Sequence, residues 1–213
     1  MAIQLGENPW ILILLMFLEL FLIIVPGFIS SRIEKKPISE VILDMGFQKN
    51  ENFIIKIIAG ISFGILFFFI GNYIIIFFRD FIVKNLFGVQ FIQQGQSGAI
   101  IVTPIQPNLV QIIILIILQI IIIGPSEEAF FRGFIIKKLN EKLKLQYSII
   151  ISAICFTLYH VPPFLVPLTT IITFFGYYFT FGLILSLIFI NFENSIIPNS
   201  VAHSCFNILI LLL

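Results

Sequence analysis

The chain has 213 residues, of which 59% are hydrophobic and only 11% are charged. Because soluble domains carry about 25% charged residues, this composition excludes an ordinary water-soluble domain and predicts an integral membrane protein. The formal net charge is +1, without a basic face or tail, so the sequence predicts no binding of nucleic acid.

Six apolar segments resemble transmembrane helices, each of which needs about 20 apolar residues. We expect spans at residues 10–29, 54–78, 109–136, 147–161, 168–190 and 198–213. The third segment is interrupted at Gly124 and Pro125. The fourth and sixth are short, as expected for helices packed inside a bundle. In the connection at 79–108, the Gln/Gly-rich patch from Gln93 to Gly98 is expected to be an exposed loop or a turn between short re-entrant pieces. The chain is predicted to be a single all-α membrane domain, residues 1–213, with a buried polar cavity.

Lysine and arginine residues alternate along the connections between these segments. The residues before the first span carry none, and the connection at 79–108 carries two. The connections at 30–53 and 137–146 carry four each. Because cytoplasmic loops are enriched in Lys and Arg, the N-terminus is predicted outside the cell membrane. The two basic connections, and any site that opens at their end of the bundle, are predicted to face the cytoplasm.

Charged side chains inside membrane segments are costly and mark functional sites. Glu127, Glu128 and Arg132 lie together in the sequence Gly-Pro-Ser-Glu-Glu-Ala-Phe-Phe-Arg-Gly-Phe. Pro125 suits a first helical turn, where the helix dipole favours both carboxylates. Glu128 and Arg132 are spaced i, i+4, so they share a helix face and can pair. Glu127 points elsewhere and stays free to act as a general base.

The two histidines of the chain, His160 and His203, both lie in apolar segments. A helix rises about 1.5 Å per residue. On this scale, both imidazoles lie at depths compatible with Glu127 if the connections at 137–146 and 191–197 are on one side of the membrane. Three separate segments are therefore predicted to bring polar side chains into one buried pocket.

Such a pocket has a defined chemistry. Glu127 and His160 can orient and deprotonate a water, and His203 with Asn207, spaced i, i+4, can donate hydrogen bonds to a developing oxyanion. Together these steps amount to peptide hydrolysis. Alternatively, Glu127, His160 and His203 could ligate a divalent metal such as zinc, which would activate water directly. The sequence contains no HExxH motif, which excludes a zincin-type site.

In this order, the residues resemble the CPBP family of intramembrane proteases, also called the CAAX-protease/Abi family. The family motif EExxxR is matched from Glu127, FxxxH is matched up to His160, and HxxxN/D is matched from His203. The similarity covers about residues 109–213. It implies an all-α membrane bundle with a conical cavity, and an endopeptidase that acts on a membrane-associated substrate of the prenylated CAAX type or the bacteriocin type.

The resemblance also implies a role for each motif residue. Glu127 would be the base that activates water, assisted by His160. The oxyanion site would be formed by His203 and Asn207, and the supporting or substrate-positioning residues would be Glu128 and Arg132. The family has been named a metalloprotease group, but a metal-free glutamate mechanism also fits and is our preferred interpretation. Two histidines and a glutamate bound to a metal would have to leave an open position and still spare a base.

Two other functions remain open at this point. A non-catalytic immunity or scaffold protein would keep the same bundle without turnover. A small transporter would use buried Glu and His as a proton relay, although the internal repeat typical of many transporters is absent. Glu19 lies in the middle of the first span, where it could face the cavity or pair with Lys56 or Arg79, and we interpret it as structural.

Overall fold

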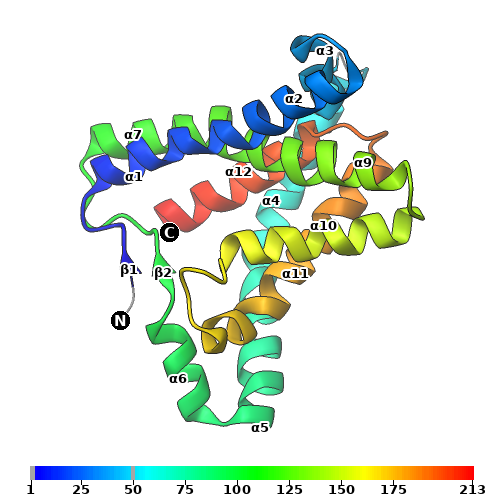
Figure 1. The fold of residues 1–213 in the computed structure, drawn as a ribbon. Helices are drawn as coiled ribbons and strands as arrows, with labels where there is room; N and C mark the ends of the chain where they lie inside the picture. Colours follow the sequence, from blue (N-terminus) through cyan, green and yellow to red (C-terminus); the bar gives the residue numbers. More distant parts are fainter. Residues whose placement is uncertain (1–2, 49–50) are drawn as a thin grey trace.

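The computed structural model describes residues 3–48 and 51–213, and this part of the chain is almost entirely helical (Figure 1). Four of its helices are long and apolar enough to cross a membrane: Pro9–Glu34, Phe53–Phe87, Leu109–Asn140 and Leu168–Asn191. Two shorter apolar helices are α10 (Leu145–His160) and α12 (Ile197–Leu212). The predicted all-α membrane bundle is confirmed, with each predicted span close to one of these six helices.

The long helices contain local changes of helix type. The first comprises α1 (Pro9–Met16), the 3₁₀ segment η1 (Phe17–Leu20) and α2 (Phe21–Glu34). The second comprises α4 (Phe53–Ile75), the π-helix η3 (Ile76–Val83) and α5 (Lys84–Phe87). The third comprises α7 (Leu109–Leu118), the π-helix η4 (Gln119–Ile123), α8 (Gly124–Glu128), the π-helix η5 (Ala129–Ile136) and α9 (Lys137–Asn140). The fourth is α11 (Leu168–Asn191).

Short elements complete the fold. They are β1 (Ile3–Gln4), α3 (Ile38–Ile42), the π-helix η2 (Leu43–Phe47), α6 (Val89–Ser97) and β2 (Ile100–Ile101). The two strands pair in parallel, with Ile3 opposite Ile100. Figure 1 shows α1 lying beside α7, and their apolar side chains form a shared core with Leu12, Ile13 and Leu115 at its centre.

The connection at 79–108 forms a short helix, α6, at the Gln/Gly-rich patch where an exposed loop or a turn was expected. Its first residues continue the second long helix, and α6 packs against α11. Gly95 makes this contact possible, because a Cβ atom there would lie 2.9 Å from the carbonyl oxygen of Thr169. Thr170 Oγ1 donates a hydrogen bond of 2.7 Å to Gly95 O. The Gln-rich composition of this segment therefore marks a packed helix.

The predicted interruption at Gly124 and Pro125 is wrong, because the helix runs through both residues. A proline ring clashes with the carbonyl four residues earlier in a regular α-helix. Here the π-helix η4 immediately precedes it, and the Gly124 N–H bonds to Gln119 O, five residues back. The wider turn relieves the clash, so Pro125 stays inside a continuous helix.

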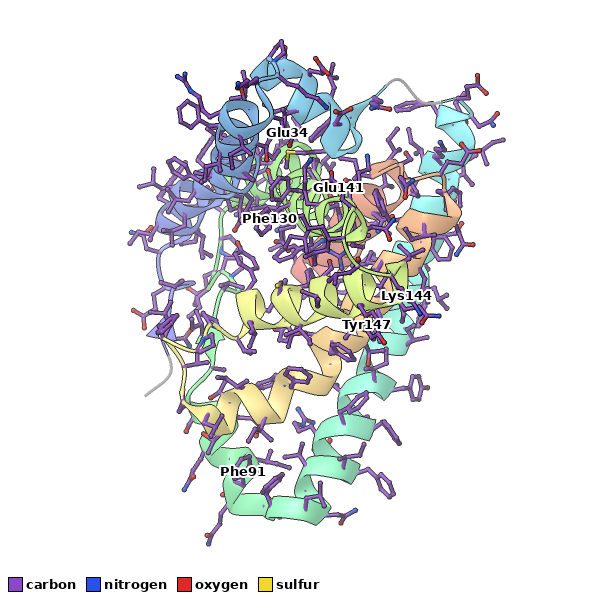
Figure 2. All side chains as sticks on the ribbon, turned by 45° about the vertical axis from the view of Figure 1, so that its right-hand side comes forward. Glu34, Phe91, Phe130, Glu141, Lys144 and Tyr147 are labelled. Carbon is purple, nitrogen blue, oxygen red and sulfur yellow. The ribbon has the colours of Figure 1, made fainter. Side chains whose placement is uncertain are left out.

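The basic connections gather at one end of the bundle. Lys137 Nζ donates a hydrogen bond of 2.6 Å to Asp44 O, and Lys138 forms ion pairs with Glu34 and Glu141. Figure 2 shows the two labelled glutamates close together at this end. The connection between α11 and α12 lies at the same end of the bundle, because the Ile196 side chain packs on Gly46. The N-terminal ends of α1 and α7 lie at the opposite end of the bundle in Figure 1.

Candidate active site

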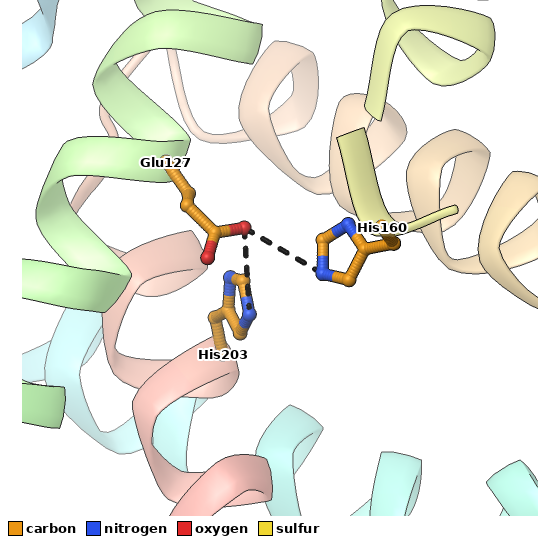
Figure 3. A group of neighbouring side chains, drawn as sticks. All are labelled: Glu127, His160 and His203. Atoms are coloured by element: carbon orange, nitrogen blue, oxygen red, sulfur yellow. Dashed lines mark ion pairs between the residues drawn. The ribbon is translucent and has the colours of Figure 1, made fainter. Parts of the chain in front are cut away.

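Three helices supply the side chains of the predicted site. Glu127 lies in α8, His160 is the last residue of α10, and His203 lies in α12. Figure 3 shows the three side chains turned toward one another. Gly124 allows α8 to approach α12, because a Cβ atom at this position would lie 2.7 Å from Ser200 O and would overlap the hydroxyl of Ser204.

Glu127 Oε2 is the atom at the centre of this cluster. It lies 3.8 Å from His160 Nε2 and 3.9 Å from His203 Nε2. Its side chain is buried, and Oε2 has no hydrogen-bond partner among residues 3–48 and 51–213. Because nearly all buried polar atoms are hydrogen-bonded, each exception needs an explanation, and a missing ligand or water is one. The separations are too long for direct hydrogen bonds and leave room for a bridging atom.

The hydrogen bonds of the two imidazoles fix which nitrogen faces Glu127. His160 Nδ1 lies 2.9 Å from Phe156 O, and His203 Nδ1 lies 3.0 Å from Glu128 Oε1. Each partner is an acceptor, so each Nδ1 carries a proton and donates. In the neutral rings, both Nε2 atoms therefore present lone pairs to Glu127. Each can accept a proton or a hydrogen bond, or bind a cation.

Glu128 holds His203 in this orientation. Its Oε1 accepts hydrogen bonds from Arg132 Nη1 at 2.9 Å and from His203, while its Oε2 accepts one from Asn199 Nδ2 at 3.2 Å. The predicted Glu128–Arg132 pair is thus confirmed, and both side chains are completely buried. Arg132 also lies over the Phe156 ring, with Cζ 4.4 Å from the ring centroid, a favourable cation–π geometry.

Asn207 lies outside this hydrogen-bond network. Its Nδ2 donates to Gln119 Oε1 at 3.0 Å, and Ser204 donates to Gln119 O at 2.7 Å. Within the described parts of the chain, the structure gives Asn207 no hydrogen bond to Glu127, His160 or His203. The predicted oxyanion role of Asn207 therefore stays a prediction, as does the buried polar cavity. The bonds to Gln119 tie the π-helix η4 to α12.

Sequence reasoning missed several residues around the site. Tyr178 stacks against His160 with ring centroids 4.6 Å apart, and Tyr159 donates a hydrogen bond to Glu19. Both tyrosines resemble ordinary packing aromatics in the sequence. The partner of Glu19 is Tyr159 instead of Lys56 or Arg79, which form ion pairs with Glu193 and Asp80, respectively. The position of Asn199 could have been predicted from the sequence, because it lies four residues before His203 and therefore on the same helix face.

The helical bundle thus holds a buried carboxylate against two imidazoles. Residues 109–209 match the family model described as Rce1-like, type II CAAX prenyl endopeptidase. All three motifs lie within the matched residues, so the match agrees with the resemblance to CPBP-type intramembrane proteases. That family acts on peptide or prenylated protein substrates within the membrane. No match was found among curated proteins, and none among solved structures.

Proposed function

We propose that this protein is an intramembrane endopeptidase in which Glu127, assisted by His160, activates the water that hydrolyses a peptide bond. The observation that carries the proposal is the buried, unpartnered Glu127 Oε2 between two imidazole nitrogens at 3.8 and 3.9 Å. A water oxygen about 2.8 Å from Glu127 Oε2 and from each imidazole nitrogen is compatible with these two distances. The match of residues 109–209 to the Rce1-like family supports the same reaction class.

In the proposed hydrolysis, Glu127 carries one proton from the attacking water to the leaving amine. Glu127 accepts a proton from water while the water oxygen attacks the carbonyl carbon of the substrate. The intermediate then collapses, the carbon–nitrogen bond breaks, and the leaving amine takes the proton from Glu127. His203 and Asn207 are the proposed donors to the oxyanion. Because His203 Nδ1–H already donates to Glu128, donation from Nε2 requires the doubly protonated ring. The adjacent carboxylate stabilises that form.

The same three residues fit a divalent metal. Glu127, His160 and His203 offer ligand atoms that all lie within 4.8 Å of one another. Both histidines donate Nδ1–H to an oxygen acceptor, as metal-bound histidines usually do. A bound zinc would act as a Lewis acid on water or on the scissile carbonyl. We nevertheless favour the metal-free mechanism, because a metal held by all three residues would have to leave an open coordination position and still spare a base.

The proposed substrate is a membrane-associated peptide segment, of the prenylated CAAX type or the bacteriocin type. We also propose that the N-terminus lies outside the cell membrane and that the site opens toward the cytoplasm. The meeting of the Lys-rich connections at one end of the bundle supports this orientation. A non-catalytic immunity or scaffold protein with the same fold is the alternative. It would not require a carboxylate at position 127.

The decisive test uses purified protein in detergent with a farnesylated peptide ending in a CAAX sequence and its unprenylated counterpart. We expect cleavage by the wild type, and a loss of about 100-fold or more with Glu127→Gln, which removes only the base. Glu141→Gln is the matched control, because Glu141 is exposed at the basic end of the bundle. Full activity of Glu127→Gln would rule out the mechanism. A biological phenotype preserved in this variant would favour the non-catalytic alternative.

A further inference from the structure

The first membrane helix contributes a partly buried acidic residue near the site. Glu19 lies in the 3₁₀ segment η1, in the middle of the 26-residue helix Pro9–Glu34. A 3₁₀ segment inside a longer helix often marks a functional hinge or a strained sequence. This segment contacts α8 and η4, the segments that carry Glu127 and Gln119. Glu19 lies well outside residues 109–209, which match the family.

The two carboxylate oxygens of Glu19 have different surroundings. Oε1 accepts a hydrogen bond from the Tyr159 hydroxyl, 140 residues away in the sequence. Oε2 is buried and has no hydrogen-bond partner among the described residues. A partly buried acidic group that is hydrogen-bonded to Tyr159, on a segment that contacts α8, belongs to the surroundings of the site.

Tyr159, which donates this hydrogen bond, directly precedes His160 in the chain. His160 is the last residue of α10, and Val161 already leaves the helical conformation, with φ −127° and ψ 70°. Helix ends fray unless they are tied down. The Tyr159 ring lies 5.5 Å from the Phe131 ring and, in an edge-on contact, 5.5 Å from the His160 ring, measured between centroids. The contact with Glu19 therefore fixes the turn that aims His160 at Glu127.

We infer that Glu19 is a positioning residue, which acts through Tyr159 to hold His160 in its reactive orientation. This inference rests on the proposed function for its catalytic consequence, but the coupling between Glu19 and His160 is a property of the fold. It gives the N-terminal helix a role in the site formed by the C-terminal half of the chain. A side chain that accepts the hydrogen bond without a charge, such as Gln, preserves that role.

The activity test compares Glu19→Leu, Tyr159→Phe, their double variant and Glu19→Gln. We expect Glu19→Leu and Tyr159→Phe each to lower kcat by about 10- to 100-fold with KM unchanged, because only the alignment of a reacting group is lost. The double variant should be no slower than either single variant, and Glu19→Gln should keep most of the activity. Tyr147→Phe, at the exposed first turn of the same helix, is the control. Losses that multiply in the double variant would overturn the inference.

A second measurement does not depend on turnover. The chain has only two histidines, so ¹⁵N-histidine labelling of the full-length protein gives two sets of ring signals, assigned with His160→Gln. We expect the His160 signals to shift or broaden in Glu19→Leu and Tyr159→Phe but not in Glu19→Gln or Tyr147→Phe. Unchanged His160 signals in the first two variants would overturn the positioning role. If these two variants show the shifts but the wild type cleaves no peptide, the proposed function is rejected and the positioning role of Glu19 stands.

Discussion

Glu128 and His203 are joined by a contact of 3.0 Å between Oε1 and Nδ1, and the same oxygen accepts a hydrogen bond from Arg132. The guanidinium balances the charge of this completely buried carboxylate. The carboxylate in turn fixes the tautomer and the ring orientation of His203. Two neighbouring glutamates thus have different tasks, since Glu128 is saturated with donors while Glu127 keeps an unpartnered oxygen.

This division of labour predicts that stability and activity respond differently to mutation of the ion pair. Glu128→Gln leaves a buried guanidinium without a counter-charge, which should cost about 3–5 kcal/mol in the free energy of unfolding. The double variant Glu128→Gln/Arg132→Met removes both charges and should regain much of that stability. It should stay inactive, because His203 has lost the carboxylate that orients it.

Thermal unfolding in detergent and peptide cleavage measure the two effects separately. Glu34→Gln/Lys138→Met, which removes a partly exposed ion pair at the end of the bundle, is the control and should change stability by less than about 1 kcal/mol. A double variant that recovers both stability and cleavage would contradict the role given to Glu128.

Gly124 should tolerate no side chain. A Cβ atom there would lie 2.7 Å from Ser200 O, so Gly124→Ala must push α8 away from α12 and separate Glu127 from His203. We expect a loss of stability of about 1–3 kcal/mol, as for other overpacked cores, and a fall in cleavage of about 100-fold.

Gly71→Ala is the matched control for this variant. Its Cβ atom would lie 3.4 Å from the Phe181 ring, an ordinary contact, in the interior of α4. Alanine is favoured over glycine in helices by about 1 kcal/mol, so unchanged or slightly raised stability is expected. Equal damage from the two substitutions would show that the approach of α8 to α12 is not special.

Chelation distinguishes the two ways of activating water. We expect the wild type to keep its cleavage activity after dialysis against 1,10-phenanthroline or EDTA, because Glu127 acts as the base without a metal. Metal analysis of the same preparation by mass spectrometry checks the interpretation. Activity that disappears on chelation and returns with added zinc would instead assign Glu127, His160 and His203 as metal ligands.

The sequence predicted the parts of this protein that depend on local patterns. The lengths of the apolar segments predicted the six helices, and the i, i+4 spacing of Glu128 and Arg132 predicted their ion pair. Motif order predicted that Glu127, His160 and His203 would meet, and the distances between their side chains agree with that grouping. These features follow from hydrophobicity and helix periodicity, which act over a few residues at a time.

Features that depend on tertiary packing were not predictable in this way. A Gly-Pro pair normally indicates a helix break, but the π-helix η4 keeps the helix continuous. In the sequence, Gly60 and Gly64 resemble ordinary residues of an apolar span. In the structure they let α4 pack against the backbone of α12, because an added Cβ atom would lie 2.7 Å from Pro198 O at Gly60 and 2.8 Å from Ala202 O at Gly64. The contact between Glu19 and Tyr159 joins residues 140 positions apart, for which a single sequence has no local signal.

The orientation in the membrane yields a prediction that depends on the ends of the bundle alone. In a variant without Cys155 and Cys205, Glu7→Cys and Lys142→Cys place single thiols at exposed positions, two residues before α1 and two residues after α9. We expect a membrane-impermeant maleimide to label position 7 in intact cells, and position 142 only after the cells are opened, because the Lys-rich end faces the cytoplasm. The cysteine-free variant controls for background labelling. The reverse pattern would place the basic connections outside and would contradict the proposed cytoplasmic opening of the site.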